Sequence, residues 1–401
     1  MLLCAELLRR GHNVTMWTSA YDHIRKEWRR EWHDSPKGYR REDGLELRFM
    51  KGTGYASNVR PQRLIDHVIA ARDFTRQAEL APRPDAIVAS LPDHATAAAA
   101  VAFARRHGVA SVVDVRDKWP DVFVERLSTS RLSPLADLAL FTEHRRARQA
   151  LAGADSVVAV MESLLTWGLA KGRRTRTEHD RVFYLTTSPR NFDPPRVARA
   201  DPVIADVLTR TEGRTRFVFV GTFNKTQHPG LILDAVDRLR AAGGFDPTRV
   251  ALIIAGAGTD AETVRTRAAA HENVHYIGWV ESQQMDDLLA HADVGILAMN
   301  FATEAFNNKA FAYLASGLPI INGATGDLAD LLASEHAGLN VPAGNADALA
   351  RAITRLAEDP ALRAELTRNV RRMFLQRFDR TRNYAEYAEH VERIAMTPRP
   401  S

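Results

Sequence analysis

Cysteine is almost absent from this sequence of 401 residues, which contains only Cys4. A single thiol excludes an internal disulfide and any metal site built from cysteines. Long apolar runs are missing as well, so the sequence predicts no membrane-spanning helix. The N-terminus lacks the charged, apolar and small-residue segments of a signal peptide. Together these absences favour a cytoplasmic protein.

Acidic residues are slightly outnumbered by basic ones, which gives a formal net charge of +5. A basic balance suits phosphate-rich substrates, nucleic acid or an anionic membrane surface. The charge is spread along the chain, and no stacking or groove-reading motif accompanies it. We therefore expect a phosphate-bearing substrate or a membrane contact, and no nucleic acid.

The densest cluster of charge also carries aromatic side chains. Residues 25–32 mix arginine, lysine and glutamate with Trp28 and Trp32. One interpretation is a solvated loop or helix face. The other is a ligand-binding loop or a peripheral contact with an anionic membrane, with both tryptophans at interfacial depth. The sequence leaves both interpretations open.

Hydrophobic segments without polar alternation recur along the chain, separated by helical patterns. Such strands indicate βαβ units in which both faces of a parallel sheet are covered. The length is comfortable for two cores, so the fold class we predict is α/β with two doubly wound, Rossmann-like domains. The predicted strands cover residues 13–18, 45–50, 86–90, 110–115 and 156–160, then 216–221, 250–256, 274–278, 294–298 and 318–322.

The two domains are predicted to join between residues 186 and 202, where prolines interrupt any helix. We assign residues 1–190 to the first domain and 203–375 to the second. Residues 376–401 carry a last helix that completes no βαβ unit, and we expect it to cross back onto the first domain.

The first domain opens on a helix at residues 2–10. Doubly wound domains begin with a strand and a glycine-rich turn ahead of that helix. The pattern therefore predicts that roughly 15–20 residues, a strand and its loop, are missing or replaced by another strand.

Ligands of open α/β sheets bind beyond the carboxyl ends of the strands, so the turns there are candidate sites. The first strand of the second domain is followed by Gly221, Thr222 and Lys225. The glycine permits close backbone approach, and the lysine can neutralise a phosphate. Gly256 and Gly258 follow the next strand and indicate either a phosphate-binding turn or a tight structural turn.

A third strand of the second domain ends at Trp279 and Val280. Backbone groups there can meet the edge of a nucleobase. The alternative is a strand terminus with a buried tryptophan.

Residues 303–319 are the most informative segment. Polar residues precede an amphipathic helix that ends at Gly317, and Lys309 lies near its start. Helix N-terminal amides and a lysine suit a diphosphate, and Glu304 could hold sugar hydroxyls. The alternative is an N-capped helix with an incidental lysine.

The second half resembles the nucleotide-sugar domain of family 4 of the GT-B glycosyltransferases, a retaining group whose signature is two glutamates separated by seven residues. The likeness is carried by residues 219–221, 255–258, 273–280, 292–295 and the Asn-Lys-x-Phe-x-Tyr-Leu-Ala-x-Gly-x-Pro run at 308–319. In the first half, residues 114–120 resemble the Arg-Asp-x-Trp-Pro stretch of aminosugar-transferring members, which build bacterial surface polysaccharides. Residues 11–15 resemble the first helix-to-strand turn of those members. The likeness is loose over residues 20–85.

This resemblance implies a GT-B enzyme, with two Rossmann-like domains facing each other across a cleft. It implies a nucleotide-sugar donor, which we expect to be a UDP-sugar, and no metal or other cofactor. Glu304 is then expected to contact the donor sugar. The loop over the sugar and diphosphate is expected to comprise Phe306, Asn307, Asn308 and Lys309.

The sequence departs from the family at three positions. Ala312 stands where the second signature glutamate would hold the ribose, and a methyl group accepts no hydrogen bond. The lost charged acceptor costs roughly 1.5–3 kcal/mol of donor binding. Thr222 replaces the usual phosphate-binding arginine, so Lys225 or Lys309 must substitute for it. Arg116 replaces the customary histidine of the N-terminal domain.

We predict retaining transfer of a hexosyl or N-acetylhexosaminyl group to a hydroxyl of a glycan, lipid-linked or small-molecule acceptor, in bacterial glycan biosynthesis. The acceptor surface is expected within residues 20–85. Lys309, Lys225 and the helix N-terminus would stabilise the leaving diphosphate, while Arg116 or Asp117 would bind donor or acceptor. Asp117 also has an interpretation as a capping residue.

Two alternatives belong to other classes. Ala312 and the missing strand also fit a catalytically silent partner that binds a sugar nucleotide or a protein, or a chain inactivated by mutation. A sugar-nucleotide epimerase is a weaker alternative, because the predicted cleft lacks paired acidic and histidine residues.

Overall fold

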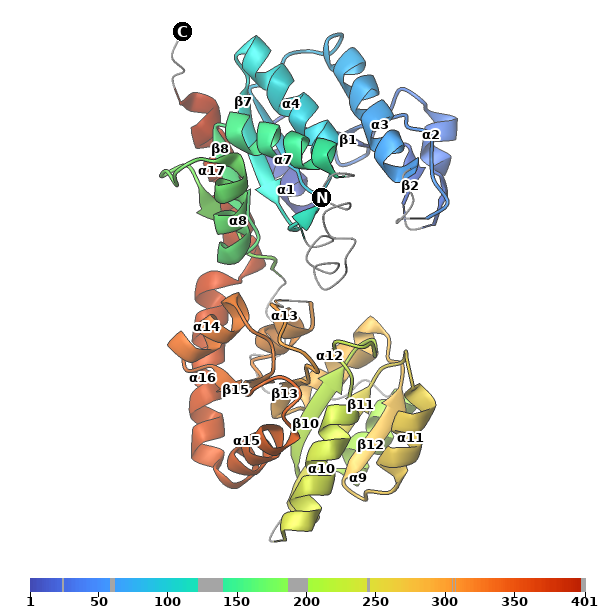
Figure 1. Cartoon of the computed structure of the whole chain (residues 1–401), viewed down its shortest axis with the longest axis vertical. Helices are drawn as coiled ribbons and strands as arrows, with labels where there is room; N and C mark the ends of the chain where they lie inside the picture. Colours follow the sequence, from blue (N-terminus) through green and yellow to red (C-terminus); the bar gives the residue numbers. More distant parts are fainter. Residues whose placement is uncertain are drawn as a thin grey trace. The chain divides into compact units, whose positions relative to one another are not determined.

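The structure is a computed structural model that describes residues 1–23, 25–57, 62–121, 140–186, 201–243, 246–304, 306 and 308–397. The chain forms two compact units (Figure 1). The N-terminal unit comprises Met1–Tyr184 and Thr381–Ser401, and the C-terminal unit comprises Leu185–Arg380. Both contain parallel strands connected by helices, so the predicted fold class is confirmed.

The C-terminal unit is built on a six-stranded sheet in which all neighbouring strands are parallel. Its order is β12-β11-β10-β13-β14-β15, so the chain moves outward from β10 in one direction and then returns to build the other half. The direction therefore reverses between β10 and β13, where a doubly wound sheet leaves a crevice for a ligand. The strands are β10 (Thr215–Val220), β11 (Val250–Ala255), β12 (Val274–Gly278), β13 (Val294–Leu297), β14 (Ile320–Asn322) and β15 (Gly338–Asn340).

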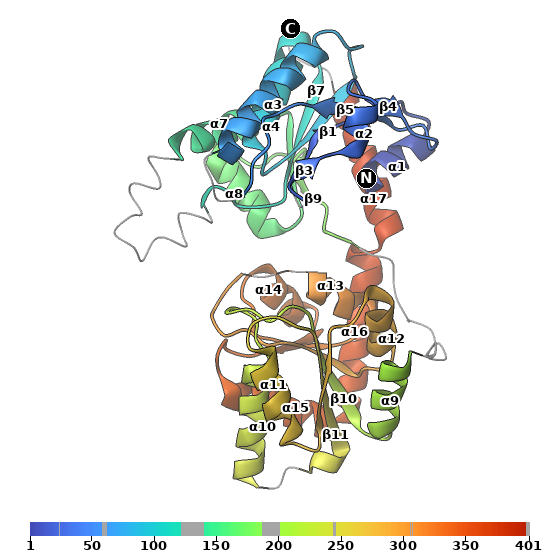
Figure 2. The same cartoon turned by 90° about the vertical axis from the view of Figure 1, so that its right-hand side faces the viewer.

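Helices cover both faces of this sheet, which explains why its strands are apolar throughout. Every residue of β11 is buried. Figure 2 shows α9 and α12 on one side of β10 and β11, with α10, α11 and α15 on the other. The helices are α9 (Pro202–Arg210), α10 (Gly230–Ala242), α11 (Ala261–Ala269), α12 (Ser282–Ala290), α13 (Asn308–Ala315), α14 (Asp327–Ser334), α15 (Ala346–Glu358) and α16 (Pro360–Arg377), with a 3-10 turn at Pro247–Arg249.

The described part of the N-terminal unit contains two sheets and a small hairpin. A parallel sheet has the order β6-β7-β8-β9, and a second sheet pairs β5 in parallel with β1 and antiparallel with β4. The strands are β1 (Thr15–Ser19), β2 (Tyr21–Asp22), β3 (Glu27–Trp28), β4 (Tyr39–Arg40), β5 (Glu46–Met50), β6 (Ala86–Ser90), β7 (Ala110–Val115), β8 (Ser156–Ala159) and β9 (Arg181–Val182). The helices are α1 (Leu2–Arg9), α2 (Arg30–Asp34), α3 (Gln62–Ala78), α4 (His94–His107), α7 (Phe141–Gly153), α8 (Glu162–Gly172) and α17 (Arg380–Met396).

The last helix, α17, packs against the N-terminal unit. Tyr387 stacks on Phe183 with ring centroids 4.4 Å apart and planes 5° apart. Val391 and Ile394 join the same apolar cluster, which includes Val112 of β7 and Val158 of β8.

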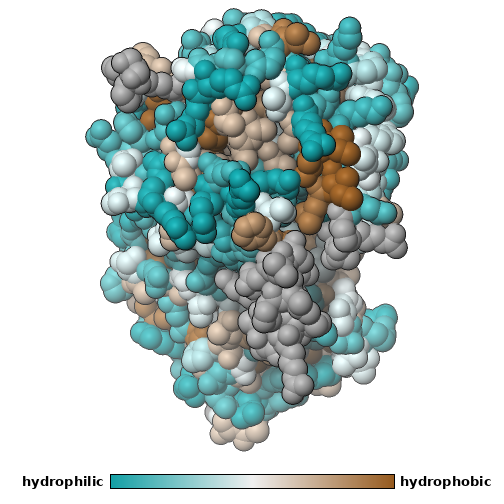
Figure 3. Space-filling view, turned by 45° about the horizontal axis from the view of Figure 1, so that its top comes forward, coloured by the Kyte–Doolittle hydropathy of each residue, from teal (hydrophilic) through white to brown (hydrophobic). Residues whose placement is uncertain are grey.

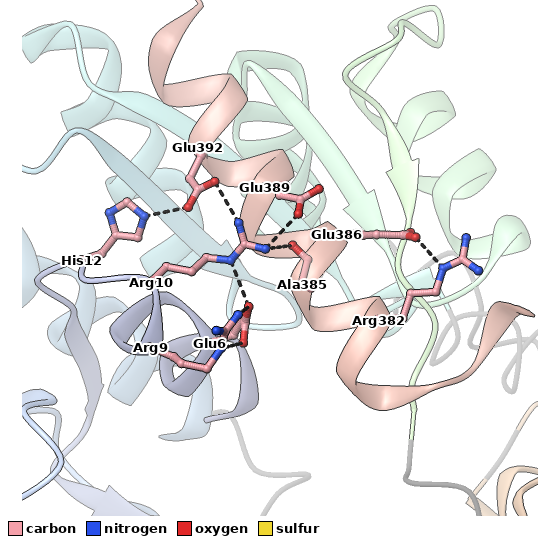
Figure 4. A network of polar contacts seen from close by, with 9 residues as sticks. All are labelled: Glu6, Arg9, Arg10, His12, Arg382, Ala385, Glu386, Glu389 and Glu392. Carbon is pink, nitrogen blue, oxygen red and sulfur yellow. Dashed lines mark hydrogen bonds and ion pairs between the residues drawn. The ribbon is translucent and has the colours of Figure 1, made fainter. Parts of the chain in front are cut away.

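A polar network fixes α17 to the first helix of the unit (Figure 4). The Arg10 guanidinium lies 2.9 Å from Glu6 and from Glu389, and 3.2 Å from Glu392. Arg10 also donates to the carbonyl of Ala385. Because the Arg10 side chain is largely shielded from water, this network is worth more than an exposed ion pair.

Hydrophilic residues cover most of the face drawn in Figure 3, and hydrophobic patches lie among them. Within the described ranges, no helix combines the length and apolar character needed to cross a membrane.

Several short strands were not predicted from the sequence. Strands β9 and β15 have two and three residues, too few for a hydrophobic period to be recognised.

Candidate functional site

The reversal point between β10 and β13 is bridged by one side chain. The two strands pair at Phe217 with Val294 and at Val218 with Gly295. Nearer their carboxyl ends, the hydroxyl of Tyr313 accepts from the backbone N–H of Val220 (3.0 Å) and donates to the carbonyl of Ile296 (3.3 Å). The hydroxyl of Tyr313 therefore fixes α13 against the opening in the sheet.

The ring of Tyr313 fits there because residue 295 is a glycine. A Cβ at Gly295 would lie 2.6 Å from the Tyr313 ring, closer than any side chain tolerates. Sequence reasoning missed both residues as parts of the site. The signal was available as a glycine inside a strand, which often marks close approach of another group.

Lys309 lies one turn before Tyr313 on the same helix. Its Nζ is buried, lies 4.4 Å from the centroid of the Phe219 ring, and has no hydrogen-bond partner among the described residues. Burial lowers the pKa of Lys309 from 10.5 to about 8, because a desolvated ammonium loses favourable interactions with water. A buried cation without an acceptor suits an anionic ligand.

Gly221 lies directly beside this ammonium. A Cβ at residue 221 would collide with Cε of Lys309 and lie 2.8 Å from its Nζ. The residue also has φ +124°, which side chains rarely adopt. Glycine at 221 therefore gives both the turn and the room that Lys309 needs.

The glycines of the neighbouring turn are needed for backbone contact between the two turns. A Cβ at Gly256 would collide with the carbonyl of Gly221, and one at Gly258 with the carbonyl of Phe223. The turns are joined by the Phe223 N–H, which donates to the carbonyl of Ala257 (2.8 Å). Close packing of the two turns therefore requires these glycines. They also place backbone groups at the carboxyl edge of the sheet.

Thr222 and Lys225 are exposed at the same edge. The carbonyl of Lys225 accepts from the side-chain amide of Asn300 (3.1 Å), which holds this loop against the segment after β13. The two predicted phosphate lysines therefore differ, since the Nζ of Lys309 is buried and the Lys225 side chain is exposed to solvent.

Trp279 is 57% exposed and does not form the buried strand terminus considered as its alternative. It follows Gly278, the last residue of β12, and its indole N–H donates to Glu281 (3.1 Å). Val280 beside it is half-buried. An exposed aromatic face at a strand end can stack on a planar ligand.

Glu304 is exposed and pairs with Thr325 in an isolated parallel bridge. A Cβ at Gly326, the N-cap of α14, would lie 2.9 Å from Cγ of Glu304. Glu304 is therefore next to the start of α14, after β14.

The predicted loop residues divide by burial. Asn308 is exposed at the start of α13, and Asn307 lies outside the described residues. Phe306 is only 5% exposed, with its ring stacked on Phe311 at 4.4 Å. Ala312 is 7% exposed and presents only a methyl group.

The N-terminal unit places Arg116 and Asp117 directly after β7, where both are exposed. Arg116 donates through Nε (2.9 Å) and Nη2 (2.7 Å) to Asp114, whose carboxyl is buried. Burial raises the pKa of Asp114, and the Arg116 guanidinium opposes that rise. Asp117 accepts from the backbone N–H of Trp119 (3.1 Å), as a capping residue does.

Chemically, the carboxyl edge of the C-terminal sheet combines a buried ammonium, glycine turns and an exposed indole. In the ranges that the structure covers, no group of three histidine, cysteine or acidic side chains could hold a metal ion. The edge is equipped to bind an anion attached to a planar group.

Family models match both halves of the chain. A model described as glycosyl transferases group 1 matches residues 214–359, and one described as a glycosyl transferase 4-like domain matches residues 1–178. No curated protein sequence matches the chain.

Solved structures share the fold at low sequence identity. Sucrose-phosphate synthase from Thermosynechococcus elongatus has a TM-score of 0.66 and 16% identity, over 98% of this chain and 91% of that one. A glycosyltransferase from Rickettsia africae has a TM-score of 0.64 and 14% identity, over 99% and 94%. Anabaena HepE in complex with UDP has a TM-score of 0.60 and 16% identity, over 87% and 86%.

Proposed function

The chain is a glycosyltransferase with the GT-B fold, and we propose that it moves a sugar, with retention of configuration, from a nucleotide diphosphate to an acceptor hydroxyl. The observation that best supports a donor site here is that the Nζ of Lys309 is buried beside Gly221 and has no hydrogen-bond acceptor among the described residues. A diphosphate supplies the missing negative charge.

The leaving diphosphate is proposed to lie against Lys309 and the backbone of Gly221. Negative charge grows on the diphosphate as the glycosidic bond breaks, so a cation already fixed there stabilises the transition state more than the ground state. Lys225 is exposed and can add charge from the solvent side.

The nucleobase is proposed to bind at the end of β12, near the exposed indole of Trp279 and the backbone of Val280. We propose uracil as the base, since HepE is described in complexes with UDP and with UDP-glucose. Glu304 is proposed to hold hydroxyls of the donor sugar. No metal is needed, because the lysine and backbone amides neutralise the diphosphate.

The N-terminal unit is proposed to bind the acceptor. Arg116 and Asp117 are exposed at the carboxyl edge of its four-stranded sheet, although Arg116 also pairs with Asp114. A glycan or lipid-linked acceptor in bacterial glycan synthesis, used in the cytoplasm or at the inner membrane face, fits the proposal.

Ala312 motivates a second candidate, a protein that binds the donor without transferring the sugar. Its methyl group, 7% exposed on α13, cannot accept hydrogen bonds from a ribose. An enzyme disabled only at the ribose would gain donor affinity and rate in Ala312→Glu, whereas a silent partner would gain no turnover.

The deciding experiment is a calorimetric titration with UDP, UDP-glucose and UDP-N-acetylglucosamine, with GDP as the base control. A nucleotide at a concentration a hundredfold above its Kd should raise the free energy of unfolding by about 2.7 kcal/mol. For a donor that binds, NMR of the transferred sugar reports its anomeric configuration. Inversion would refute retention. The donor site would be refuted if no nucleotide bound to either wild type or Ala312→Glu.

A further inference from the structure

His94 is a buried histidine that the proposed chemistry does not use. It is the first residue of α4, next to the cap residue Asp93, and it is 0% exposed. Its Nδ1 lies 3.2 Å from Oε2 of Glu143, and its Nε2 lies 2.9 Å from the carbonyl oxygen of Trp119.

Both of these partners can only accept. A carbonyl oxygen has no proton to give. Glu143 is also paired with Arg146 (2.5 Å). Burial raises the pKa of the Glu143 carboxyl, but His94 and Arg146 lower it by more, so the pKa lies below its ordinary value. A neutral His94 carries only one ring proton, so it would turn a nitrogen lone pair toward either the Glu143 carboxylate or the Trp119 carbonyl, and two acceptors facing each other are unfavourable inside a protein.

We infer that His94 is an imidazolium that donates one proton to Glu143 and the other to the Trp119 carbonyl, and that it is thereby the positioning residue for the loop after β7. The loop runs from Arg116 to Pro120 and follows the last residue of β7. The imidazolium joins this loop to α4 and α7, so three separate segments meet at one buried cation.

The loop carries groups suited to a sugar ring. The indole of Trp119 is half-buried, and the Arg63 guanidinium lies 5.8 Å from its ring centroid. An indole face and a guanidinium recognise pyranose rings and anionic substituents. That this loop meets the acceptor rests on the proposed function, whereas the protonation of His94 does not.

Other charged groups lie near the His94–Glu143 pair and affect its protonation. Asp93 accepts from the Thr96 N–H at the start of α4 and lies 3.7 Å from His67 of α3. The titratable and charged groups near His94 and the loop are Glu143 and Arg146 on α7, Asp93 at the N-cap of α4, and His67 and Arg63 on α3. The loop itself carries Arg116, Asp117 and Lys118.

Nitrogen NMR on the full chain tests the protonation directly. Histidine labelled with nitrogen-15 in the ring gives two similar shifts when both nitrogens carry protons and two widely different shifts when only one does. The His94 signal is identified by its loss in His94→Gln. We expect two protonated nitrogens at pH 7.5 in wild type, and a neutral ring in Glu143→Gln. A neutral ring in wild type would overturn the inference.

Fluorine NMR tests the positioning. With 5-fluorotryptophan, the Trp119 signal is assigned from Trp119→Phe, and we expect it to shift or broaden in both His94→Gln and Glu143→Gln. His107→Gln, at the other end of α4, is the matched control and should leave the Trp119 signal in place. An unchanged signal in Glu143→Gln, or an equal change in His107→Gln, would refute the positioning role.

Donor binding separates this inference from the proposed function. UDP should bind His94→Gln within about twofold of wild type, because every proposed donor contact lies in the C-terminal unit. If no nucleotide of the panel binds to wild type or to Ala312→Glu, the proposed donor site fails, while both NMR experiments still decide the state of His94.

Discussion

The Nζ of Lys309 lies 4.4 Å from the centroid of the Phe219 ring, inside the carboxyl edge of the C-terminal sheet. The ring face partly offsets the loss of water around the ammonium. This compensation is incomplete, since the pKa of Lys309 is still lowered to about 8 by burial. The protein therefore keeps a partly desolvated cation at the position where the proposed donor carries its diphosphate.

Gly221→Ala should weaken UDP binding by at least about tenfold. Its methyl group would push Lys309 away, and φ +124° is unfavourable for alanine. Gly213→Ala is the matched control, because Gly213 also has a positive φ (+74°) but open space around a new Cβ. Calorimetry should show normal UDP affinity in Gly213→Ala, and a comparable loss in both variants would contradict the argument.

Lys309→Met should abolish UDP binding and yet stabilise the free protein by about 1–3 kcal/mol at pH 7, since it removes a desolvated charge. The lowered pKa means that the unfolded chain holds more protons than the folded one between about pH 8 and 10.5. The penalty is thus complete below pH 8 and fades as the pH rises to 10.5. Chemical unfolding at several pH values measures this penalty. A Lys309→Met variant less stable than wild type at pH 7 would refute the prediction.

UDP affinity of wild type should be flat just below pH 8 and fall by up to about tenfold per pH unit above it. The free protein loses the Lys309 proton near pH 8, whereas a bound diphosphate holds that proton to higher pH. Calorimetry from pH 7.5 to 9.5 in buffers of different ionisation enthalpy should also show proton uptake. An affinity independent of pH over this range would place the diphosphate away from Lys309.

Tyr313→Phe should destabilise the protein by about 1–3 kcal/mol and weaken UDP binding, because the buried N–H of Val220 and C=O of Ile296 lose their shared partner. Tyr39→Phe, at a half-buried position in the N-terminal unit, serves as the control. Unfolding curves and UDP titrations measure both effects. Normal stability would show that the hydroxyl does not bridge the strands.

The sequence predicts the sheet of the C-terminal unit well because long apolar strands such as β11 can only lie inside a covered parallel sheet. It also identifies Lys309 and Gly221, since a lysine near a helix start and a glycine after a strand carry local signals. It cannot show that Phe306 is buried against Phe311, because that stacking depends on tertiary packing. For the same reason, the pairing of His94 with Glu143, 49 residues later, has no sequence signal.

The contact of α17 with the N-terminal unit should be sensitive to acid through His390. Nε2 of this buried histidine lies 2.9 Å from Oγ of Ser156, which donates to the carbonyl of His179. Its Nδ1 accepts from Arg393 (3.1 Å), so the ring is neutral with its proton on Nε2. Burial, with Arg393 nearby, lowers the pKa of His390 to about 4.

The unfolded chain binds a proton on His390 near pH 6.5, and the folded chain only near pH 4. Stability from this group is therefore present above pH 6.5 and is lost as the pH falls toward 4. Gln at 390 can donate to Ser156 and accept from Arg393 without titrating, so His390→Gln should lose less stability over this range than wild type. Denaturant unfolding at pH 7, 5.5 and 4.5 measures the difference, and parallel losses in both proteins would show that His390 is already charged in the folded state.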